Sequence, residues 1–476
     1  MAQPTSTGTD AAPAESPADL TATALLTAYR DGTLSPVEAT DAVLDRIDAH
    51  DGDLNAFCLV DADRAREQAR ASEQRWHQGR PDGLIDGVPV SIKDIFLTRD
   101  WPTLRGSRTV DPNQTWATDG PPVARMREHN AVFVGKTTTP ELAWKGVTDN
   151  PLTGITRNPW NTSRTPGGSS GGASAAVAAG MAPLSIGTDG GGSVRIPASF
   201  CGIYTIKPTY GRIPHWPASP YGTLAHAGPM TTTVSETALL MDVITRFDPR
   251  DWSSLQPPAA SHLDGLEDGV RGLRIAVSPG LGYAHVDPEI AAAVTRAAET
   301  FAELGAHVEP VDPGIGDCVE EFHTLWFSGA AKSTEHLTDA QRALLDPGLR
   351  EIVDEGNRYS AQDYLEAMRV RMALGEHFGR FHQTYDLLLT ATVPVSPFEA
   401  GREVPDGAPY RRWTGWTPLT YPFNMTQQPA ASVPCGHDSD GLPIGLQVVA
   451  ARHQDPLVLR ASRAFERARP WHRPTL

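Results

Sequence analysis

The chain has 476 residues, 40% of them hydrophobic, and 41 basic against 57 acidic side chains give a formal charge of −16 at pH 7. This length and composition allow a large buried core. No run of about 18 apolar residues is present, so we expect no membrane-spanning segment. The acidic balance disfavours nucleic acid and anionic membranes as partners, because like charges repel.

The N-terminal segment is expected to lie outside the folded part of the chain. Residues 1–20 are rich in Ala, Pro, Thr and Asp, without the basic and apolar regions of a signal peptide. We therefore expect a disordered tail over residues 1–20 and one large domain over residues 21–476, in a cytoplasmic protein. The segment 248–262, which contains a Pro-Pro pair, indicates a linker or a surface loop.

The first part of the domain predicts two helices and a strand. A short helix is expected near residues 22–30. A second helix begins at Ser35, because the Pro and Glu that follow it form a capping-box pattern. Alternating apolar residues then predict a strand over residues 87–94, in which Ser91 and Lys93 share one face.

The rest of the chain continues to alternate between helical and extended patterns. Helices are predicted at 122–129, from 288 to the glycine at 305, and over most of 318–382. Strands are predicted at 131–134, 273–277, 387–395 and 444–449. This alternation indicates an α/β fold with a largely parallel or mixed sheet.

Two clusters rich in glycine and serine, 166–174 and 187–195, carry the strongest local signal. A flexible linker would have this composition. That interpretation is disfavoured, because an alanine-rich helix predicted at 175–180 and the apolar segment 196–200 enclose the clusters. We therefore expect both clusters to belong to the folded domain.

Two known motifs fit this region only formally. Residues 135–137 look like the end of a phosphate-binding P-loop, but the required upstream glycine position holds Asn130. Residues 167–171 satisfy G-x-S-x-G, the nucleophile elbow of α/β-hydrolases. That elbow needs a preceding central strand, and the segment 158–164 cannot form one. Both interpretations are therefore disfavoured.

The remaining interpretation is nucleophilic catalysis without histidine. Three consecutive glycines before Ser193 allow successive backbone N–H groups to converge on one negative oxygen. A serine hydroxyl is a weak nucleophile and needs a base. No histidine lies near either cluster in sequence, so the neighbouring groups are Ser169 or Ser170 and, more distantly, Lys93.

Together these motifs resemble the amidase signature family of serine hydrolases over roughly residues 20–470. The matching stretches are 87–94, 157–160, 165–179, 187–197, 200–202, 207–209, 228–230 and 422–434. The resemblance implies an α/β fold in which helices cover a central mixed sheet. It also implies a hydrolase that cleaves amide C–N bonds through a serine acyl-enzyme.

The resemblance assigns roles to individual positions. It implies a catalytic triad of Ser193 as nucleophile, Ser169 as the cis-serine and Lys93 as the base. It places the oxyanion hole on the backbone N–H groups of Gly190, Gly191, Gly192 and Ser193. It gives a supporting, hydrogen-bonding role to Ser170, Asp189 and Arg195. A lysine has an ordinary pKa of about 10.4, so the role of base requires burial that disfavours its charged form.

Substrate contacts are predicted by analogy and from the positions of aromatic residues. The candidates are the loop with Trp144, Gly146 and Thr148, the segment 215–221 with Tyr221, and Trp413, Trp416 and Tyr421. Aromatic walls favour an apolar acyl or aryl group. We therefore expect an aryl or alkyl amidase of the aryl-acylamidase or urethanase kind, which also cleaves carbamates because they present the same carbonyl group.

Alternative functions and partners remain open at this point. The A subunit of a glutamine-dependent tRNA amidotransferase shares the triad and acts with partner chains, but it usually carries an aspartate where this chain has Ala225. A non-catalytic binding protein on the same scaffold is the third alternative. Four isolated cysteines and the absence of an H-E-x-x-H pattern predict no disulfide framework, metal or cofactor. We expect a monomer or a homodimer.

Overall fold

The centre of the molecule is one mixed sheet of 11 strands, seen in a computed structural model that describes residues 16–476. The spatial order is β1-β3-β2-β6-β8-β7-β12-β13-β11-β9-β10. The strands are β1 (Phe57–Val60), β2 (Pro89–Lys93), β3 (Val132–Thr137), β6 (Leu184–Asp189), β7 (Tyr204–Lys207), β8 (His226–Thr231), β9 (Arg274–Val277), β10 (His307–Pro310), β11 (Leu387–Ala391), β12 (Ala430–His437) and β13 (Pro443–Ala450), and a separate hairpin pairs β4 (Asp149–Asn150) with β5 (Gly154–Ile155). The predicted α/β fold with a central mixed sheet is confirmed.

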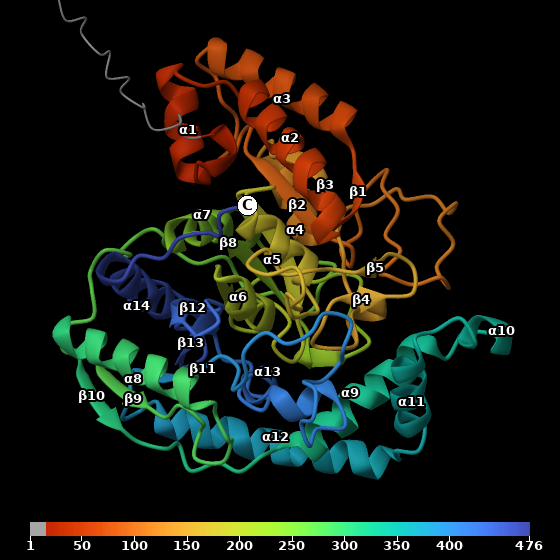
Figure 1. Ribbon diagram of the computed structural model, residues 1–476, viewed down its shortest axis with the longest axis vertical. Coiled ribbons are helices and arrows are strands. Elements are labelled where there is room, and N and C mark those ends of the chain that lie inside the picture. Colours follow the sequence, from red (N-terminus) through yellow and green to blue (C-terminus); the bar gives the residue numbers. More distant parts are fainter. Residues whose placement is uncertain (1–15) are drawn as a thin grey trace, which may run out of the picture.

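Helices surround this sheet, with α1–α3 near one end of the long axis and α12 near the other (Figure 1). The α-helices are α1 (Ala22–Asp31), α2 (Pro36–Leu54), α3 (Ala62–His77), α4 (Pro121–Glu128), α5 (Gly171–Ala178), α6 (Arg195–Cys201), α7 (Val234–Ile244), α8 (Pro288–Glu303), α9 (Val319–Thr334), α10 (Asp339–Arg342), α11 (Pro347–Gly356), α12 (Ala361–Phe381), α13 (Pro422–Met425) and α14 (Asp455–Ala468). Short 3-10 helices are η1 (Pro17–Asp19), η2 (Glu141–Ala143), η3 (Gly222–Leu224) and η4 (Trp413–Trp416). Within residues 16–476, no helix has both the length and the apolar character that a membrane crossing needs.

The N-terminal elements follow the local sequence signals. Ser35 caps α2 through the predicted capping box: its Oγ accepts a hydrogen bond from the Glu38 N–H at 3.2 Å, and Glu38 Oε2 accepts from the Ser35 N–H at 2.8 Å. Of the tail expected over residues 1–20, the structure describes only 16–20, which contain η1. Asp19 at the end of η1 pairs with the Arg46 guanidinium on α2.

The two parallel strands β2 and β6 lie side by side in the sheet and position the glycine- and serine-rich segments. Ile92 of β2 is in register with Ile186 of β6. The carboxyl ends of neighbouring parallel strands meet at one edge of a sheet, where α/β proteins place their functional loops. Lys93, the last residue of β2, therefore lies beside the end of β6, where the second glycine cluster begins.

Helix α5 follows the first cluster and is buried along its whole length. Its residues are small because neighbouring groups approach its backbone closely. A Cβ on Gly172 would lie 2.3 Å from Thr138 Oγ1, a separation that no carbon–oxygen contact allows. The alanine-rich pattern that argued against a flexible linker thus reflects tight helix packing against the sheet region.

Candidate active site

Lys93 ends strand β2 with a side chain that is completely buried. Its Nζ lies 2.8 Å from Ser169 Oγ, 2.9 Å from Ser170 Oγ and 2.8 Å from Thr188 Oγ1. It makes no ion pair with any carboxylate of the described residues. Burial lowers the pKa of the Lys93 amine well below its usual value, and the more distant Asp189 carboxylate opposes this only in part.

The three hydroxyl contacts of Lys93 constrain where the protons lie. A neutral amine has two N–H donors and one lone pair, so it cannot donate to all three hydroxyls at once. Ser170 Oγ donates to the Thr188 carbonyl at 3.1 Å, and it therefore accepts from Lys93. This leaves the lone pair for the hydroxyl proton of Ser169 or Thr188. The geometry allows Lys93 to take a proton from Ser169.

Ser169 and Ser193 come together although they lie on different loops. Both line one cavity of about 180 Å³. The backbone N–H of Ser170 donates to the carbonyl of Ser193 at 3.0 Å, which ties the two loops to each other. The peptide bond before Ser169 is cis. No strand leads directly into Ser169, so the α/β-hydrolase elbow is absent, as the sequence indicated.

The cavity has an apolar wall with aromatic side chains from distant parts of the chain. The segment 215–221 lines it, as predicted, and includes Tyr221. The Tyr221 ring stacks on Trp326 of α9 with ring centroids 3.8 Å apart. Trp326 and Phe96 also line the cavity and were missed from sequence, because neither lies in a recognisable motif.

Three of the predicted substrate contacts, Trp144, Gly146 and Trp416, do not line this cavity. Trp144 and Trp416 are fully buried and do not line the cavity. Gly146 lies behind the cavity against tryptophan rings, and a Cβ there would be 3.3 Å from two ring carbons of Trp416. Trp413 and Tyr421, also expected near the substrate, belong to the same buried aromatic cluster. These residues build the wall from behind and do not form its inner surface.

The Trp416→Phe substitution is therefore expected to lower stability and leave the KM of an amide substrate within about twofold. The indole N–H of Trp416 donates to the Glu403 carbonyl at 2.9 Å, and its ring stacks on Phe200. Loss of that hydrogen bond and of ring volume should cost about 1–3 kcal/mol of unfolding free energy. Urea denaturation and steady-state kinetics check this, and a large KM change without a stability loss would contradict the assignment.

The glycine run before Ser193 is arranged differently from the expectation in one respect. The Gly192 N–H donates to Asp189 Oδ1 at 2.8 Å, so it is not free to bind a substrate oxygen, which corrects its predicted role in the oxyanion hole. Gly192 instead makes the turn, with φ +123° and no room for a Cβ beside Thr420 Oγ1. The N–H groups of Gly190, Gly191 and Ser193 remain as the candidate donors.

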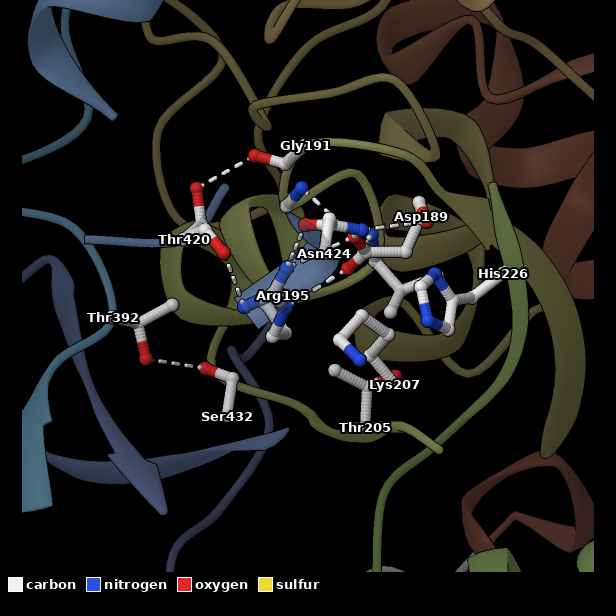
Figure 2. A network of polar contacts seen from close by, with 12 residues as sticks. Asp189, Gly191, Arg195, Thr205, Lys207, His226, Thr392, Thr420, Asn424 and Ser432 are labelled. Atoms are coloured by element: carbon white, nitrogen blue, oxygen red, sulfur yellow. Dashed lines mark hydrogen bonds and ion pairs between the residues drawn. The ribbon is translucent and has the colours of Figure 1, made fainter. Parts of the chain in front are cut away.

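A buried ion pair holds this turn in place (Figure 2). The Asp189 carboxylate accepts from Arg195 Nε and Nη2, each at 3.0 Å, and from Asn424 Nδ2 at 2.8 Å. Neither charged side chain is exposed. Burial alone would raise the pKa of Asp189, but the adjacent Arg195 guanidinium holds it below its ordinary value. Asp189 therefore stays ionised and can fix the backbone of the glycine run.

The remaining guanidinium donors of Arg195 reach the C-terminal part of the chain. They bind the Thr420 carbonyl at 2.9 Å, Gln447 Oε1 at 2.7 Å and Asn424 Oδ1 at 2.6 Å. The segment 422–434 matched the family from sequence, but the contact of Asn424 with Asp189 and Arg195 was not predicted. Nothing in the sequence around Gln447 or Thr420 indicates a link to residue 195.

A second buried lysine lies near this network but makes different contacts. Lys207 Nζ donates to the backbone carbonyls of Pro208 and Gln428, not to serine hydroxyls. Burial and the nearby Arg195 charge lower its pKa. Its carbonyl contacts give it a structural role. Within residues 16–476, no group of three or more His, Cys, Asp or Glu side chains is arranged to hold a metal ion.

Comparisons with known proteins identify relatives along almost the whole chain. The model of the amidase family matches residues 38–459. An acylamidase from Rhodococcus erythropolis is 37% identical over 459 residues, covering 95% of this chain and 96% of its own. The A subunit of a glutamyl-tRNA(Gln) amidotransferase from Chloroflexus aggregans is 34% identical over 489 residues, covering 96% and 98%. A solved bacterial aryl acylamidase of the amidase signature family superposes with a TM-score of 0.89 at 34% identity, covering 95% and 97%.

Proposed function

Because the chain belongs to the amidase signature family of carbon–nitrogen hydrolases, we propose that it cleaves aryl or alkyl amides of small molecules, and the corresponding carbamates, with Ser193 as the nucleophile. One observation carries the proposal. Lys93 is buried without an ion-pair partner among the described residues, and its amine lies 2.8 Å from the hydroxyl of Ser169. A lysine in this setting is a base at neutral pH.

The reaction begins when Ser193 Oγ attacks the amide carbonyl carbon. Its proton passes to Ser169 Oγ, and Ser169 gives its own proton to neutral Lys93. The negative oxygen that develops on the substrate accepts hydrogen bonds from the N–H groups of Gly190, Gly191 and Ser193. The cationic Lys93 has no carboxylate partner among residues 16–476 to hold its proton, which makes it a ready donor for the next step.

The leaving amine takes that proton back through the same relay. Cleavage of the carbon–nitrogen bond leaves the acyl group as an ester on Ser193 and Lys93 neutral again. Water then attacks the ester carbonyl while Lys93 and Ser169 accept its proton, and the acid departs as Ser193 regains its own. No cofactor enters this sequence. The proton that leaves with the amine is replaced by one from water, so Lys93, Ser169 and Ser193 end in their starting protonation states.

The cavity lining supports a substrate with an apolar or aromatic group. Phe96, Tyr221 and Trp326 contribute rings to its wall, and such walls suit aryl and alkyl substituents. The relatives named an acylamidase and an aryl acylamidase point to the same class. Carbamates place an identical carbonyl carbon beside a nitrogen leaving group, so the same relay would serve them.

The second candidate function is that of an amidotransferase A subunit, favoured by the 34% identical relative of that name. Such a protein works with partner chains. Against it, Ala225 lies in the cavity lining, at the position where that subunit usually carries an aspartate. Turnover of a simple anilide by the isolated chain, without glutamine or partners, distinguishes the two functions.

Phenylmethanesulfonyl fluoride is expected to modify Ser193 alone and to abolish release of 4-nitroaniline from 4-nitroacetanilide. Peptide mass spectrometry locates the label, and absorbance of 4-nitroaniline measures turnover without added glutamine. The Ser193→Ala protein, as the control, should acquire no label. A label on another serine, or turnover that survives complete labelling, would contradict the assignment of the nucleophile.

A further inference from the structure

The catalytic cavity contains an isolated positive charge. Arg105 is the one charged side chain among its described lining residues; the other lining side chains are uncharged. The lining His215 is neutral at physiological pH, because burial lowers the pKa of its imidazole to about 4 although Asp251 opposes this. Lys93 beneath the cavity is the neutral base described above. A ligand in this cavity therefore meets one cation and no anion.

The Arg105 guanidinium has no partner among residues 16–476. Its side chain makes no hydrogen bond or ion pair there, in contrast to the fully paired Arg195. The Asp94 carboxylate, whose charge acts on Arg105, is occupied by Lys136 Nζ at 2.7 Å and accepts the backbone N–H of Arg105 at 2.8 Å. A guanidinium keeps its charge in proteins and presents several N–H donors in a planar fork. Partial burial of such a group without a partner is unfavourable.

The backbone fixes Arg105 at this position. Its φ of +56° lies in the left-handed region, which is strained for a residue other than glycine. The conformation is held from both sides: the N–H binds Asp94, and the carbonyl accepts from the Leu142 N–H at 2.8 Å. Leu142 itself lines the cavity. A strained, doubly anchored residue with a free guanidinium at the cavity is typical of a ligand-binding position.

We propose that Arg105 is a specificity-determining residue that docks a carboxylate carried by the amide substrate. The inference rests on the proposed function, since it names the substrate class of the same cavity. A carboxylate is planar and accepts two parallel hydrogen bonds from a guanidinium fork, which suits it to this unpaired group. The substrate is then an amide with one anionic group in addition to its apolar part.

Two isosteric substrate pairs test this, one for each side of the scissile bond. Succinyl 4-nitroanilide is compared with 4-methylpentanoyl 4-nitroanilide, and 4-acetamidobenzoate with 4-isopropylacetanilide. We expect the acid of at least one pair to have a kcat/KM higher by about 10- to 100-fold. Arg105→Gln should remove that preference and Arg105→Glu should reverse it. The matched control is Arg108→Gln, an exposed arginine of the same loop, which should retain the preference.

The outcomes separate the two proposals. If the neutral amide of each pair is cleaved with the same kcat/KM as the acid, the role of Arg105 is overturned and the amidase proposal stands. The same holds if the preference for the acid survives in Arg105→Gln. Absence of turnover with all four amides would overturn the amidase proposal. Calorimetric titration of 4-acetamidobenzoate into Ser193→Ala and into Ser193→Ala/Arg105→Gln then decides the role of Arg105 without catalysis. A Kd raised about 10- to 100-fold in the second protein supports it, and equal Kd values refute it.

Discussion

Replacing Lys93 by Met is expected to lower kcat for an anilide by about 10²- to 10⁴-fold while the protein stays folded. Methionine keeps the approximate volume of the side chain but cannot accept a proton from Ser169. Lys93→Arg should be equally inactive, because a guanidinium does not lose its proton in this pH range. Steady-state kinetics and thermal denaturation measure both effects.

The pH profile gives an independent check on the same residue. In the proposed mechanism neutral Lys93 is the active form, so kcat/KM should rise with pH through the lowered pKa of Lys93 and be lost as the amine is protonated at lower pH. Because burial lowers that pKa well below its ordinary 10.5, the rise should be complete well before pH 10. Ser91→Ala is the matched control, since Ser91 is buried on the same strand but binds Ser185. Full activity of Lys93→Met, or a rise centred near pH 10.5, would contradict the assignment.

Breaking the buried pair between Asp189 and Arg195 is expected to lower stability more than the loss of any exposed ion pair. Arg195→Met would leave the Asp189 carboxylate inside the protein without its countercharge, at a cost of about 3–5 kcal/mol in unfolding free energy. The glycine run should also lose its fixed conformation, because Asp189 holds the Gly192 N–H. Urea denaturation gives the stability loss, and anilide turnover the loss of activity.

A surface pair and a double variant serve as the comparison. Arg369 pairs with Glu366 on the exposed face of α12, and Arg369→Met should cause no measurable change in stability or activity. In the double variant Asp189→Asn/Arg195→Met no uncompensated charge remains, so its stability loss should be smaller than the sum of the single losses. Additive losses would show that the two side chains act independently, against the geometry of the network.

The sequence located some elements accurately and missed others for a physical reason. Helix α2 was predicted from its capping box, which is a local interaction between residues three apart. Strands β6 and β8 were missed. Strand β6 contains Gly187 and ends at Asp189, and β8 contains Gly228 and Pro229, residue types that are depleted in strands. Their central place in the sheet is decided by pairing with neighbours, not by their own composition.

In the site, too, local sequence predicted some features and tertiary packing decided the others. The sequence by itself indicated the residues that we propose carry the chemistry, since Lys93, Ser169 and Ser193 lie in short motifs that resemble those of the family. Only the tertiary structure decided which groups are free, buried or paired: the Gly192 N–H is occupied, Trp416 lies behind the cavity, and Arg105 lines it unpaired. Burial and pairing depend on segments far apart in the chain, and a local motif contains no information about what packs against it.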